Sequence, residues 1–398
     1  MGEWPTAVIN PPVRILMGPG PSPVHPRVYR AMTAPMLGYQ DPAFHQIMDE
    51  VKALLRMLFD TGNELSFPVS GTGSAGMETA VCNSLEPGDH IIVGINGFFG
   101  ARIAEMARRV GAEVTLVEAE WGSIVEPQAL KEALDQHPST KAVALVHGET
   151  STGVLQPMEE IARLVKEHDA LLILDTVTSL GGCPVDVDAW QVDFCYSGSQ
   201  KCLNVPPGLA PLTVSPRGLA AIKARTHPVV NWYLDLSLIQ NYWNQSRAYH
   251  HTPPVSMIYA LREGLALIAE EGLTPRFQRH IRNARALYAG LEAMGLQLFV
   301  PQAYCLPSLT TVRVPQGIDD ARVRGALVAE HSIDIGGGQG PLAGKVWRIG
   351  LMGYGSNPEH LLSLLAALGR LLAREGFKGD VRAGAAAAAE ALAQAGTA

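Results

Sequence analysis

SFPVSGTGSAGMETAV, residues 66–81, joins a short apolar stretch to a helical pattern through a glycine-rich hexapeptide. That hexapeptide, GTGSAG at 71–76, has the spacing G-x-G-x-x-G where a strand gives way to a helix. Glycines let a backbone approach an anion, and the first N–H groups of the helix face it. A dinucleotide site would also need an acidic residue at the end of the next strand. That strand ends in GING at 94–97, with no carboxylate. The loop therefore favours a single phosphate, with a tight structural turn as the alternative.

Further apolar stretches of the same kind follow along the chain, and helical patterns such as residues 158–168 separate most of them. Crossovers of this length predict a mostly parallel sheet with helices on both faces. We therefore expect an α/β fold built on a seven-stranded sheet. The strand-like stretches begin at Ser66, His90, Glu113, Ala142, Ala170, Asp193 and Pro211.

The pattern changes after about residue 225, where a loop-rich region precedes two long helical patterns, at 256–272 and 274–294. Short strand-like stretches and a helix at 357–374 complete a smaller α+β unit. The alanine-rich tail predicts a peripheral helix or a frayed end. The expected divisions are an N-terminal segment 1–20, a large domain 21–270, a small domain 271–378 and a tail 379–398; the expected short strands are 297–300, 310–314, 333–337 and 345–351.

The composition is that of an ordinary soluble globular protein, with 398 residues, 47% apolar and 17% charged. A net charge of −7 argues against nucleic-acid and anionic-membrane partners. No apolar run has the length of a membrane span, and the N-terminus has no signal-peptide pattern. The five cysteines are odd in number and lack C-x-x-C spacing, which argues against a disulfide framework or a metal site and favours a cytoplasmic location.

A lysine and an aspartate occupy unusual positions. Lys201 lies in YSGSQKCLNVPPG, residues 196–208, between a strand-like stretch and a turn, although lysine is normally a solvated surface residue. Asp175 ends the most apolar stretch, ALLILD, at the edge where α/β sheets bind ligands. A buried carboxylate there needs a cationic partner. A protonated pyridine nitrogen would serve.

Three further side chains fit the same chemistry. Thr150 follows the strand-like stretch AVALVH and can donate to a ring oxygen; Phe99 follows HIIVGI and offers a flat face for stacking. Arg348, in KVWRIG, suits two-pronged capture of a carboxylate. A phosphate loop, a strand-end acid, a stacking aromatic and a later lysine together indicate pyridoxal 5′-phosphate, which lysines bind as a Schiff base.

From about Arg14 to Glu375 the sequence resembles the class V aminotransferases of pyridoxal-phosphate fold type I, and among them the alanine–glyoxylate aminotransferases. The resemblance lies in MGPGPSPV, SGTGSAGMETA, VGINGFFG, HGETSTGVLQP, LDTVTSLGG, YSGSQKCLNVPPG, YHHT, YALREGLALIAEEG and GKVWRIGLMG. Two departures keep their chemistry: Phe99 stands where such enzymes often have Trp, and Thr150 where they have Ser.

The resemblance implies a transaminase that acts on small amino and keto acids by a ping-pong mechanism. Active sites shared across a homodimer are also implied, with the N-terminal segment against the partner subunit. Lys201 would be the catalytic residue and would bind the cofactor. The other implied cofactor-binding residues are Thr72, Gly73, Ser74, Phe99, Thr150, Asp175, Val177 and Gln200, with Tyr249 and Thr252 from the partner subunit. The implied substrate-binding residues are Arg348, Tyr39, Thr150 and Gly20.

The amino donor is left between alternatives. GYQDPAF (38–44) and other segments also resemble enzymes that transaminate (S)-ureidoglycine. Those enzymes bind the ureido group with amide side chains. Tyr39 and Tyr249 stand at the matching positions, which favours alanine or serine, although neighbouring Gln40 keeps the alternative open. A cysteine desulfurase is less similar, because Gln200 rather than His precedes Lys201. The sequence predicts transfer of an amino group to glyoxylate from a small donor.

Overall fold

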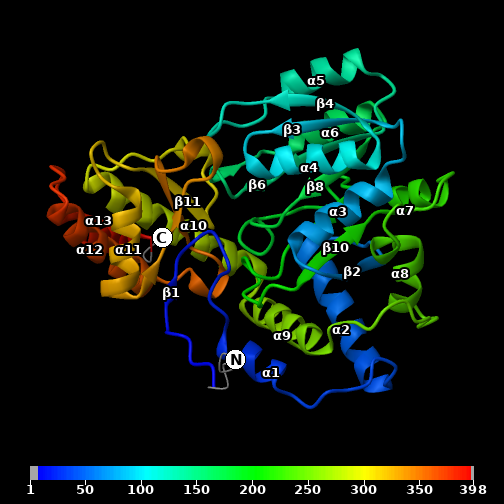
Figure 1. The fold of residues 1–398 in the computed structure, drawn as a ribbon, viewed down its shortest axis with the longest axis horizontal. Helices are drawn as coiled ribbons and strands as arrows, with labels where there is room; N and C mark the ends of the chain where they lie inside the picture. Colours follow the sequence, from blue (N-terminus) through cyan, green and yellow to red (C-terminus); the bar gives the residue numbers. More distant parts are fainter. Residues whose placement is uncertain (1–7, 396–398) are drawn as a thin grey trace, which may run out of the picture.

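A seven-stranded sheet forms the centre of the larger unit in the computed structural model, which describes residues 8–395 (Figure 1). The strand order is β2-β10-β9-β8-β5-β3-β4, and β10 runs antiparallel to both neighbours while the other pairs are parallel. The predicted α/β fold with a mostly parallel sheet is confirmed. The strands are β2 (Leu65–Ser70), β3 (His90–Ile95), β4 (Glu113–Glu118), β5 (Ala142–Val146), β8 (Leu171–Asp175), β9 (Phe194–Tyr196) and β10 (Leu209–Val214).

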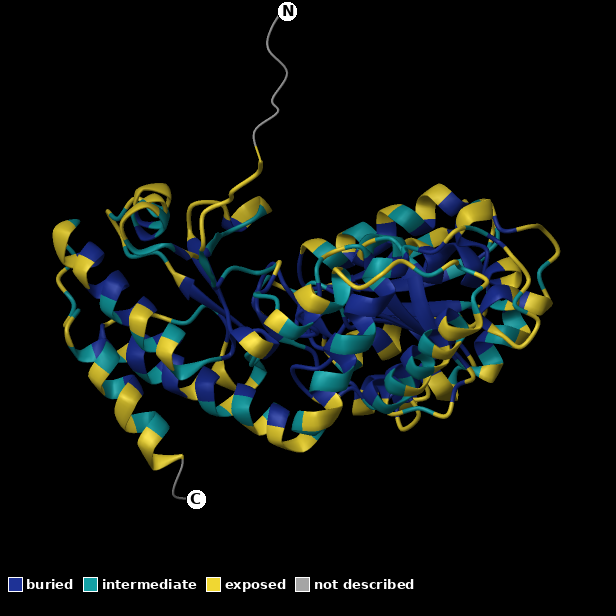
Figure 2. Cartoon of the chain, turned by 90° about the horizontal axis from the view of Figure 1, so that it is seen from below, coloured by how far each residue is buried: buried dark blue, intermediate teal, exposed yellow. Residues whose placement is uncertain are grey.

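Helices cover both faces of this sheet, and Figure 2 shows the buried residues gathered along it. Helix α3 contacts β8, β9 and β10, α4 contacts β3, β4 and β5, and α2 packs with α9. A single large core of aliphatic and aromatic residues lies between these layers. The helices of this unit are α1 (Pro26–Met32), α2 (Pro42–Phe59), α3 (Gly73–Ser84), α4 (Phe98–Val110), α5 (Pro127–Gln136), α6 (Glu159–Glu167), α7 (Pro216–Lys223), α8 (Leu236–Trp243) and α9 (Val255–Glu271).

The second unit has its own core, formed mainly by residues beyond 285. Its three-stranded antiparallel sheet has the order β11-β14-β13. The expected strand at 297–300 is wrong: only Leu298 forms an isolated bridge, to Val312, and Pro301 follows at once. The elements are α10 (Leu273–Ala293), β11 (Leu309–Arg313), α11 (Asp320–His331), β12 (Ile333–Asp334), β13 (Gly336–Gly337), β14 (Val346–Gly350), α12 (Pro358–Arg374) and α13 (Ala383–Gln394).

Both ends of the described chain pack on this second unit. Strand β1 (Ile15–Leu16) pairs in parallel with β12, and the alanine-rich tail forms α13, which packs against α10 and α12. The tail is thus an ordered helix in its described part. The domain boundaries, and packing of residues 1–20 on a partner subunit, stay predictions, and residues 1–7 lie outside the described part.

The parallel strands bring six chain segments to the carboxyl end of the large sheet, and five of them carry predicted site residues. These five follow strands β2, β3, β5, β8 and β9, and the sixth follows β4. The glycine loop, Phe99, Thr150, Asp175 and Lys201 lie at these strand ends or in the segments that follow. Between residues 8 and 395, no helix combines the length and the apolar character needed to cross a membrane.

Candidate active site

Lys201 is buried, with 9% of its surface exposed, in the loop that follows β9. Its ammonium Nζ donates a hydrogen bond to the carbonyl oxygen of Pro19. Burial, and then the neighbouring positive charge of Arg348, lower the pKa of Lys201 to about 8. An appreciable fraction of the amine is therefore neutral near pH 7, which a lysine that acts as a nucleophile or base requires.

Gly20 is fixed by its contact with this lysine. Its φ of +110° lies in a region that residues with a side chain rarely adopt. A Cβ atom at Gly20 would also lie 2.7 Å from Lys201 Nζ. The implied site residue Gly20 is therefore adjacent to the lysine, and its lack of a side chain leaves room for the amine.

Asp175 is fully enclosed at the end of β8. The backbone N–H of Val177 donates to its Oδ1 at 2.8 Å, and the Tyr196 hydroxyl donates to its Oδ2 at 2.9 Å. Burial raises the pKa of Asp175 to about 7. No described lysine, arginine or histidine lies within 4.0 Å of its oxygens, so the carboxylate lacks the cation that would stabilise its charge. A pyridinium N–H would provide one.

The start of α3 forms an anion cradle next to these two residues. Thr72 is the N-cap of α3, and its side chain makes no capping hydrogen bond, so its hydroxyl is free. Gln200 places a buried Oε1 with no hydrogen-bond partner at the same site. Unmet polar groups of this kind, at a helix N-terminus, fit the phosphate of pyridoxal 5′-phosphate.

One pocket unites most of the predicted cofactor residues. Thr150 is buried, and its hydroxyl hydrogen-bonds that of Thr178, while Phe99 is partly exposed at the start of α4. The predicted residues that line the pocket are Thr72, Gly73, Ser74, Phe99, Thr150, Asp175, Val177, Gln200 and Lys201.

Glu149 determines where Phe99 lies. This buried carboxylate accepts hydrogen bonds from the backbone N–H of Phe99 at 3.0 Å and from the N–H and hydroxyl of Ser151 at 2.9 and 2.7 Å. It thereby caps the N-terminus of α4 from the neighbouring loop. Stacking by Phe99 would depend on this cap.

Arg348 reaches toward the pocket from β14 of the second unit. Its Nε donates to the carbonyl oxygen of Gly337 at 2.7 Å, and its Nη1 donates to that of Thr150 at 3.2 Å. Burial lowers the pKa of Arg348 to about 10, so it remains a cation at neutral pH. A guanidinium here, close enough to influence the charge of Lys201, is placed to bind a substrate carboxylate.

Five predicted residues are not part of the pocket lining. Gly20 and Arg348 adjoin it, whereas Tyr39, Tyr249 and Thr252 lie apart from it within one chain. The rings of Tyr39 and Tyr249 lie 5.1 Å apart on the surface, and the Tyr249 hydroxyl hydrogen-bonds that of Thr252 at 3.3 Å. Tyr249 is 57% exposed. A contribution to a partner's pocket is compatible with this exposure and stays a prediction.

Sequence reasoning missed several residues of the site. Tyr196 binds Asp175 because β8 and β9 align these residues in register, which the sequence alone does not reveal. Arg102 could have been found, since it lies one helical turn after Phe99 and i,i+3 neighbours share a face. The residues missed in the pocket lining are Met77, Arg102, Val146 and Gly148.

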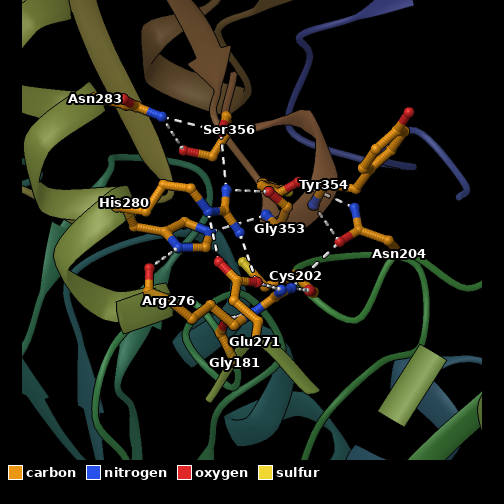
Figure 3. Close-up of polar contacts among 12 residues, drawn as sticks. Gly181, Cys202, Asn204, Glu271, Arg276, His280, Asn283, Gly353, Tyr354 and Ser356 are labelled. Atoms are coloured by element: carbon orange, nitrogen blue, oxygen red, sulfur yellow. Dashed lines mark hydrogen bonds and ion pairs between the residues drawn. The ribbon is translucent and has the colours of Figure 1, made fainter. Parts of the chain in front are cut away.

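A buried network holds the segment after Lys201 (Figure 3). Arg276 of α10 donates to the carbonyl oxygens of Gly181 at 2.7 Å and Cys202 at 2.5 Å. Asn204 has a left-handed φ of +55° and accepts a hydrogen bond from the N–H of Tyr354 at 2.6 Å. Gly353 packs so closely that a Cβ would lie 1.7 Å from Asn204 Oδ1. The lysine loop is therefore attached to both α10 and the chain after β14.

Replacing the buried arginine of this network is expected to destabilise the fold. Arg276→Met would leave two buried carbonyl oxygens and part of the charge of Glu271 without a partner. We expect a loss of about 3 kcal/mol in the free energy of unfolding, measured by urea titration. Arg285→Met, at an exposed position of the same helix, is the control. A loss no larger than that of the control would contradict the assigned role.

Together the fold and the pocket define a pyridoxal 5′-phosphate enzyme of fold type I. Residues 29–353 match the family model of the class-V aminotransferases. The chain therefore belongs to the class-V aminotransferase family, which confirms the resemblance, the transaminase activity class and the cofactor.

Relatives at more than 40% identity include bearers of two different activity names. An (S)-ureidoglycine–glyoxylate transaminase of Bacillus subtilis is 43% identical over 382 residues, which cover 91% of each chain. An alanine–glyoxylate aminotransferase of Callithrix jacchus is 42% identical, covering 92% of this chain and 89% of its own. A solved alanine–glyoxylate aminotransferase of Nostoc sp. superimposes with a TM-score of 0.90 at 47% identity, covering 94% of this chain and 98% of its own. The two kinds of relative are similarly close.

Proposed function

We propose that the protein transfers an amino group to glyoxylate from a small donor, L-alanine or L-serine. The observation that carries this proposal is the side-chain chemistry of the pocket. A carboxylate-binding cation, Arg348, lies at its edge, and Gln200 is the one amide side chain in the described lining. Gln200 lies beside the predicted phosphate site, and the amide oxygen of Gln339, outside that lining, accepts a hydrogen bond from Arg348 Nη1 at 3.5 Å. The site therefore offers a small α-amino acid a carboxylate partner, while these two amides are committed to the phosphate site and to Arg348 rather than to a ureido group.

Gln40, which kept the ureidoglycine alternative open, supports the same choice. Its Nε2 donates to the carbonyl oxygen of Arg247 at 3.4 Å, and the residue is exposed. The rings of Tyr39 and Tyr249 lie nearby rather than amides. A buried ureido group without hydrogen-bond partners would cost binding energy.

(S)-Ureidoglycine remains the second candidate donor, on one specific observation. The solved ureidoglycine–glyoxylate aminotransferase of Bacillus subtilis superimposes on this chain with a TM-score of 0.94, covering 96% of this chain and 99% of its own. The similarity therefore covers nearly the whole chain. Serine–pyruvate transamination would need only a different acceptor in the same pocket.

Each predicted site residue has a role in this proposal. Thr72, Gly73, Ser74 and Gln200 would hold the phosphate of the cofactor, and Asp175 would hold its pyridine nitrogen protonated. Phe99 and Val177 would enclose the ring, and Thr150 would donate to the phenolic oxygen. The bound cofactor supplies an electron sink for the carbanion at the α-carbon.

Lys201 would hold the cofactor and move the proton. Arg348 would orient the substrate by its carboxylate, so that the α-carbon faces Lys201 Nζ. The neutral amine would then take the α-proton. Its lowered pKa supports this role, because a protonated amine could not accept a proton.

A homodimer and a cytoplasmic location are part of the proposal. The segment with Tyr249 and Thr252 is exposed, and Trp232 is 60% exposed although it is a large aromatic residue. If a second copy of the chain covered this surface, Tyr249 and Thr252 of the first copy would lie near the phosphate cradle of the second. The absence of C-x-x-C spacing in the sequence fits a reducing compartment.

A donor half-reaction panel tests the proposed substrate. L-Alanine, L-serine and (S)-ureidoglycine are added separately to purified holoenzyme without an acceptor, and the change in the cofactor's visible absorbance is followed by stopped flow. We expect rapid conversion with alanine or serine and slow conversion with ureidoglycine. Rapid conversion by ureidoglycine alone would reject the small donor and would show that the tyrosines do not exclude a ureido group.

A further inference from the structure

Arg102 is a cation of the pocket to which no role has been assigned above. It comes from the first turns of α4, lines the pocket together with Lys201, and is half-buried. Its Nη1 donates a hydrogen bond to Ser74 Oγ at 3.0 Å. Ser74 is the second residue of α3, in the anion cradle, so the guanidinium lies one hydrogen bond from the predicted phosphate.

The charge of Arg102 is not neutralised within the described chain. No carboxylate among residues 8–395 lies within 4.0 Å of its guanidinium nitrogens. Arg109, two turns further along α4, shows the ordinary alternative: it is exposed and forms an ion pair with Glu105 at 2.8 Å. A half-buried guanidinium without an acidic partner points to an anion that is not part of this chain.

The charges of the pocket also require a cation near the cradle. A phosphate monoester carries nearly two negative charges at pH 7, and Asp175 adds another in its ionised form. Lys201 cannot balance the phosphate, because in the proposed mechanism its nitrogen is attached to the cofactor or neutral. The N-terminus of α3 supplies only about half a positive charge. Among the described residues of the pocket lining, Arg102 is the cation that remains.

The same side chain also touches the predicted stacking residue. The guanidinium carbon lies 5.0 Å from the centre of the Phe99 ring and 5.1 Å from that of Phe98. Contacts at this distance are attractive cation–π interactions. Arg102 therefore links Ser74 of the phosphate cradle to Phe99.

We propose that Arg102 is a cofactor-binding residue that neutralises the phosphate of pyridoxal 5′-phosphate and restrains Phe99. This role does not depend on which amino donor the enzyme uses. In the bound state the guanidinium would keep Ser74 Oγ as acceptor, which leaves the serine proton to be donated to a phosphate oxygen. Phosphate affinity would then depend on a cation from α4 as well as on the neutral groups of the glycine loop and Gln200.

The test compares two ligands that differ only in the phosphate. Apoprotein of the wild type, Arg102→Gln and Arg102→Lys is titrated with pyridoxal 5′-phosphate and with pyridoxal, and binding is followed by tryptophan fluorescence. Arg102→Gln should weaken binding of the phosphate ester by about tenfold or more, the value of one charge-assisted hydrogen bond. Affinity for pyridoxal should change little, and added NaCl should weaken phosphate-ester binding less in the variant than in the wild type.

Controls keep the result interpretable. Arg109→Gln removes a cation of the same helix and should leave both affinities unchanged. Arg102→Lys keeps the charge without the planar fork and should give an intermediate affinity for the phosphate ester. If Arg102→Gln does not fold, the Arg102→Lys variant provides the test. Inorganic phosphate, added as a competitor, should then inhibit binding of pyridoxal 5′-phosphate more strongly in the wild type than in this variant.

Two results would overturn the proposal. Equal weakening of both ligands by Arg102→Gln would leave only a role in holding Phe99. The second contrary result is that Arg102→Gln leaves the ratio of the affinities for pyridoxal 5′-phosphate and pyridoxal unchanged and disrupts the dimer on size-exclusion chromatography. Arg102 would then belong to a contact between subunits. The experiment involves no turnover, so a wrong assignment of the amino donor would not affect it.

Discussion

Lys201→Ala is expected to abolish transamination while pyridoxal 5′-phosphate remains bound. The variant loses the amine that takes the α-proton, and general-base catalysis is worth up to about 10⁴-fold. It keeps Asp175, the start of α3 and Gln200, which line the same pocket and would hold the cofactor independently of the lysine. Steady-state rates with alanine and glyoxylate measure the first effect. Cofactor retained through gel filtration, and measured by absorbance, shows the second.

Two controls separate loss of the base from loss of structure. Lys223→Ala, at an exposed position at the end of α7, should behave as the wild type. Methylamine added to Lys201→Ala should restore part of the rate, because removal of the side chain leaves room for a small base. Wild-type turnover in Lys201→Ala would reject the assignment of the catalytic residue.

Asp175→Asn is expected to lower the transaminase activity strongly and, at alkaline pH, to raise the stability of the apoprotein. An amide cannot hold a pyridine nitrogen protonated, so the electron sink is weakened, and we expect kcat to fall by about 10³-fold, near the middle of the range for a residue that controls a proton. The amide oxygen can still accept from the Val177 N–H, and the Tyr196 hydroxyl can turn to accept from the amide nitrogen. Steady-state kinetics and the cofactor's absorbance across pH measure this loss.

The apoprotein of the same variant should be more stable than the wild type at alkaline pH. Burial raises the pKa of Asp175 to about 7 in the folded chain, against about 3.9 when unfolded. Between these values the folded state binds a proton that the unfolded state does not, so wild-type stability falls as pH rises from about 4 to about 7. The neutral amide of the Asp175→Asn variant would remove this penalty, and the gain should be full at pH 8 and vanish toward pH 4.

Urea unfolding of cofactor-free protein at these two pH values provides the measurement. Asp169→Asn changes a carboxylate whose side chain is 94% exposed and should show no such dependence. The contrary result would be that Asp175→Asn lowers the free energy of unfolding equally at pH 8 and at pH 4. The carboxylate of Asp175 would then have a stabilising partner that the proposed site does not include.

The large unit could be predicted from the sequence because most strands of its sheet are buried along their length and appear as continuous apolar runs. The edge strand β4 is only partly buried, and its shorter apolar pattern was recognised as well. The antiparallel direction of β10 has no such signal, since it depends on which neighbours the strand finds. The second unit was harder to predict, because strands as short as β12 and β13 pair through two residues each.

The candidate site divides in a similar way. Residues at strand ends, such as Asp175 and Lys201, were found because position along a strand predicts position in the sheet. Tyr196 and Arg276 were not, because their roles arise from register and from a helix that begins more than seventy residues after the lysine. Arg348 was predicted to bind a carboxylate, which stays a prediction, whereas its effect on the lysine could be seen only in the three-dimensional arrangement.

The enclosure of Lys201 has a consequence for how the protein is made. Pro19 and Ser22 hydrogen-bond the lysine from before the sheet, and Arg276, Met352 and Tyr354 fix the following loop from after it. As the chain leaves the ribosome, the complete sheet therefore emerges before the lysine is enclosed. The contacts of the lysine loop with Met352 and Tyr354 can form only after the chain has been translated beyond residue 354. A nascent chain that captures cofactor earlier would do so without the contacts that set the chemistry of the lysine.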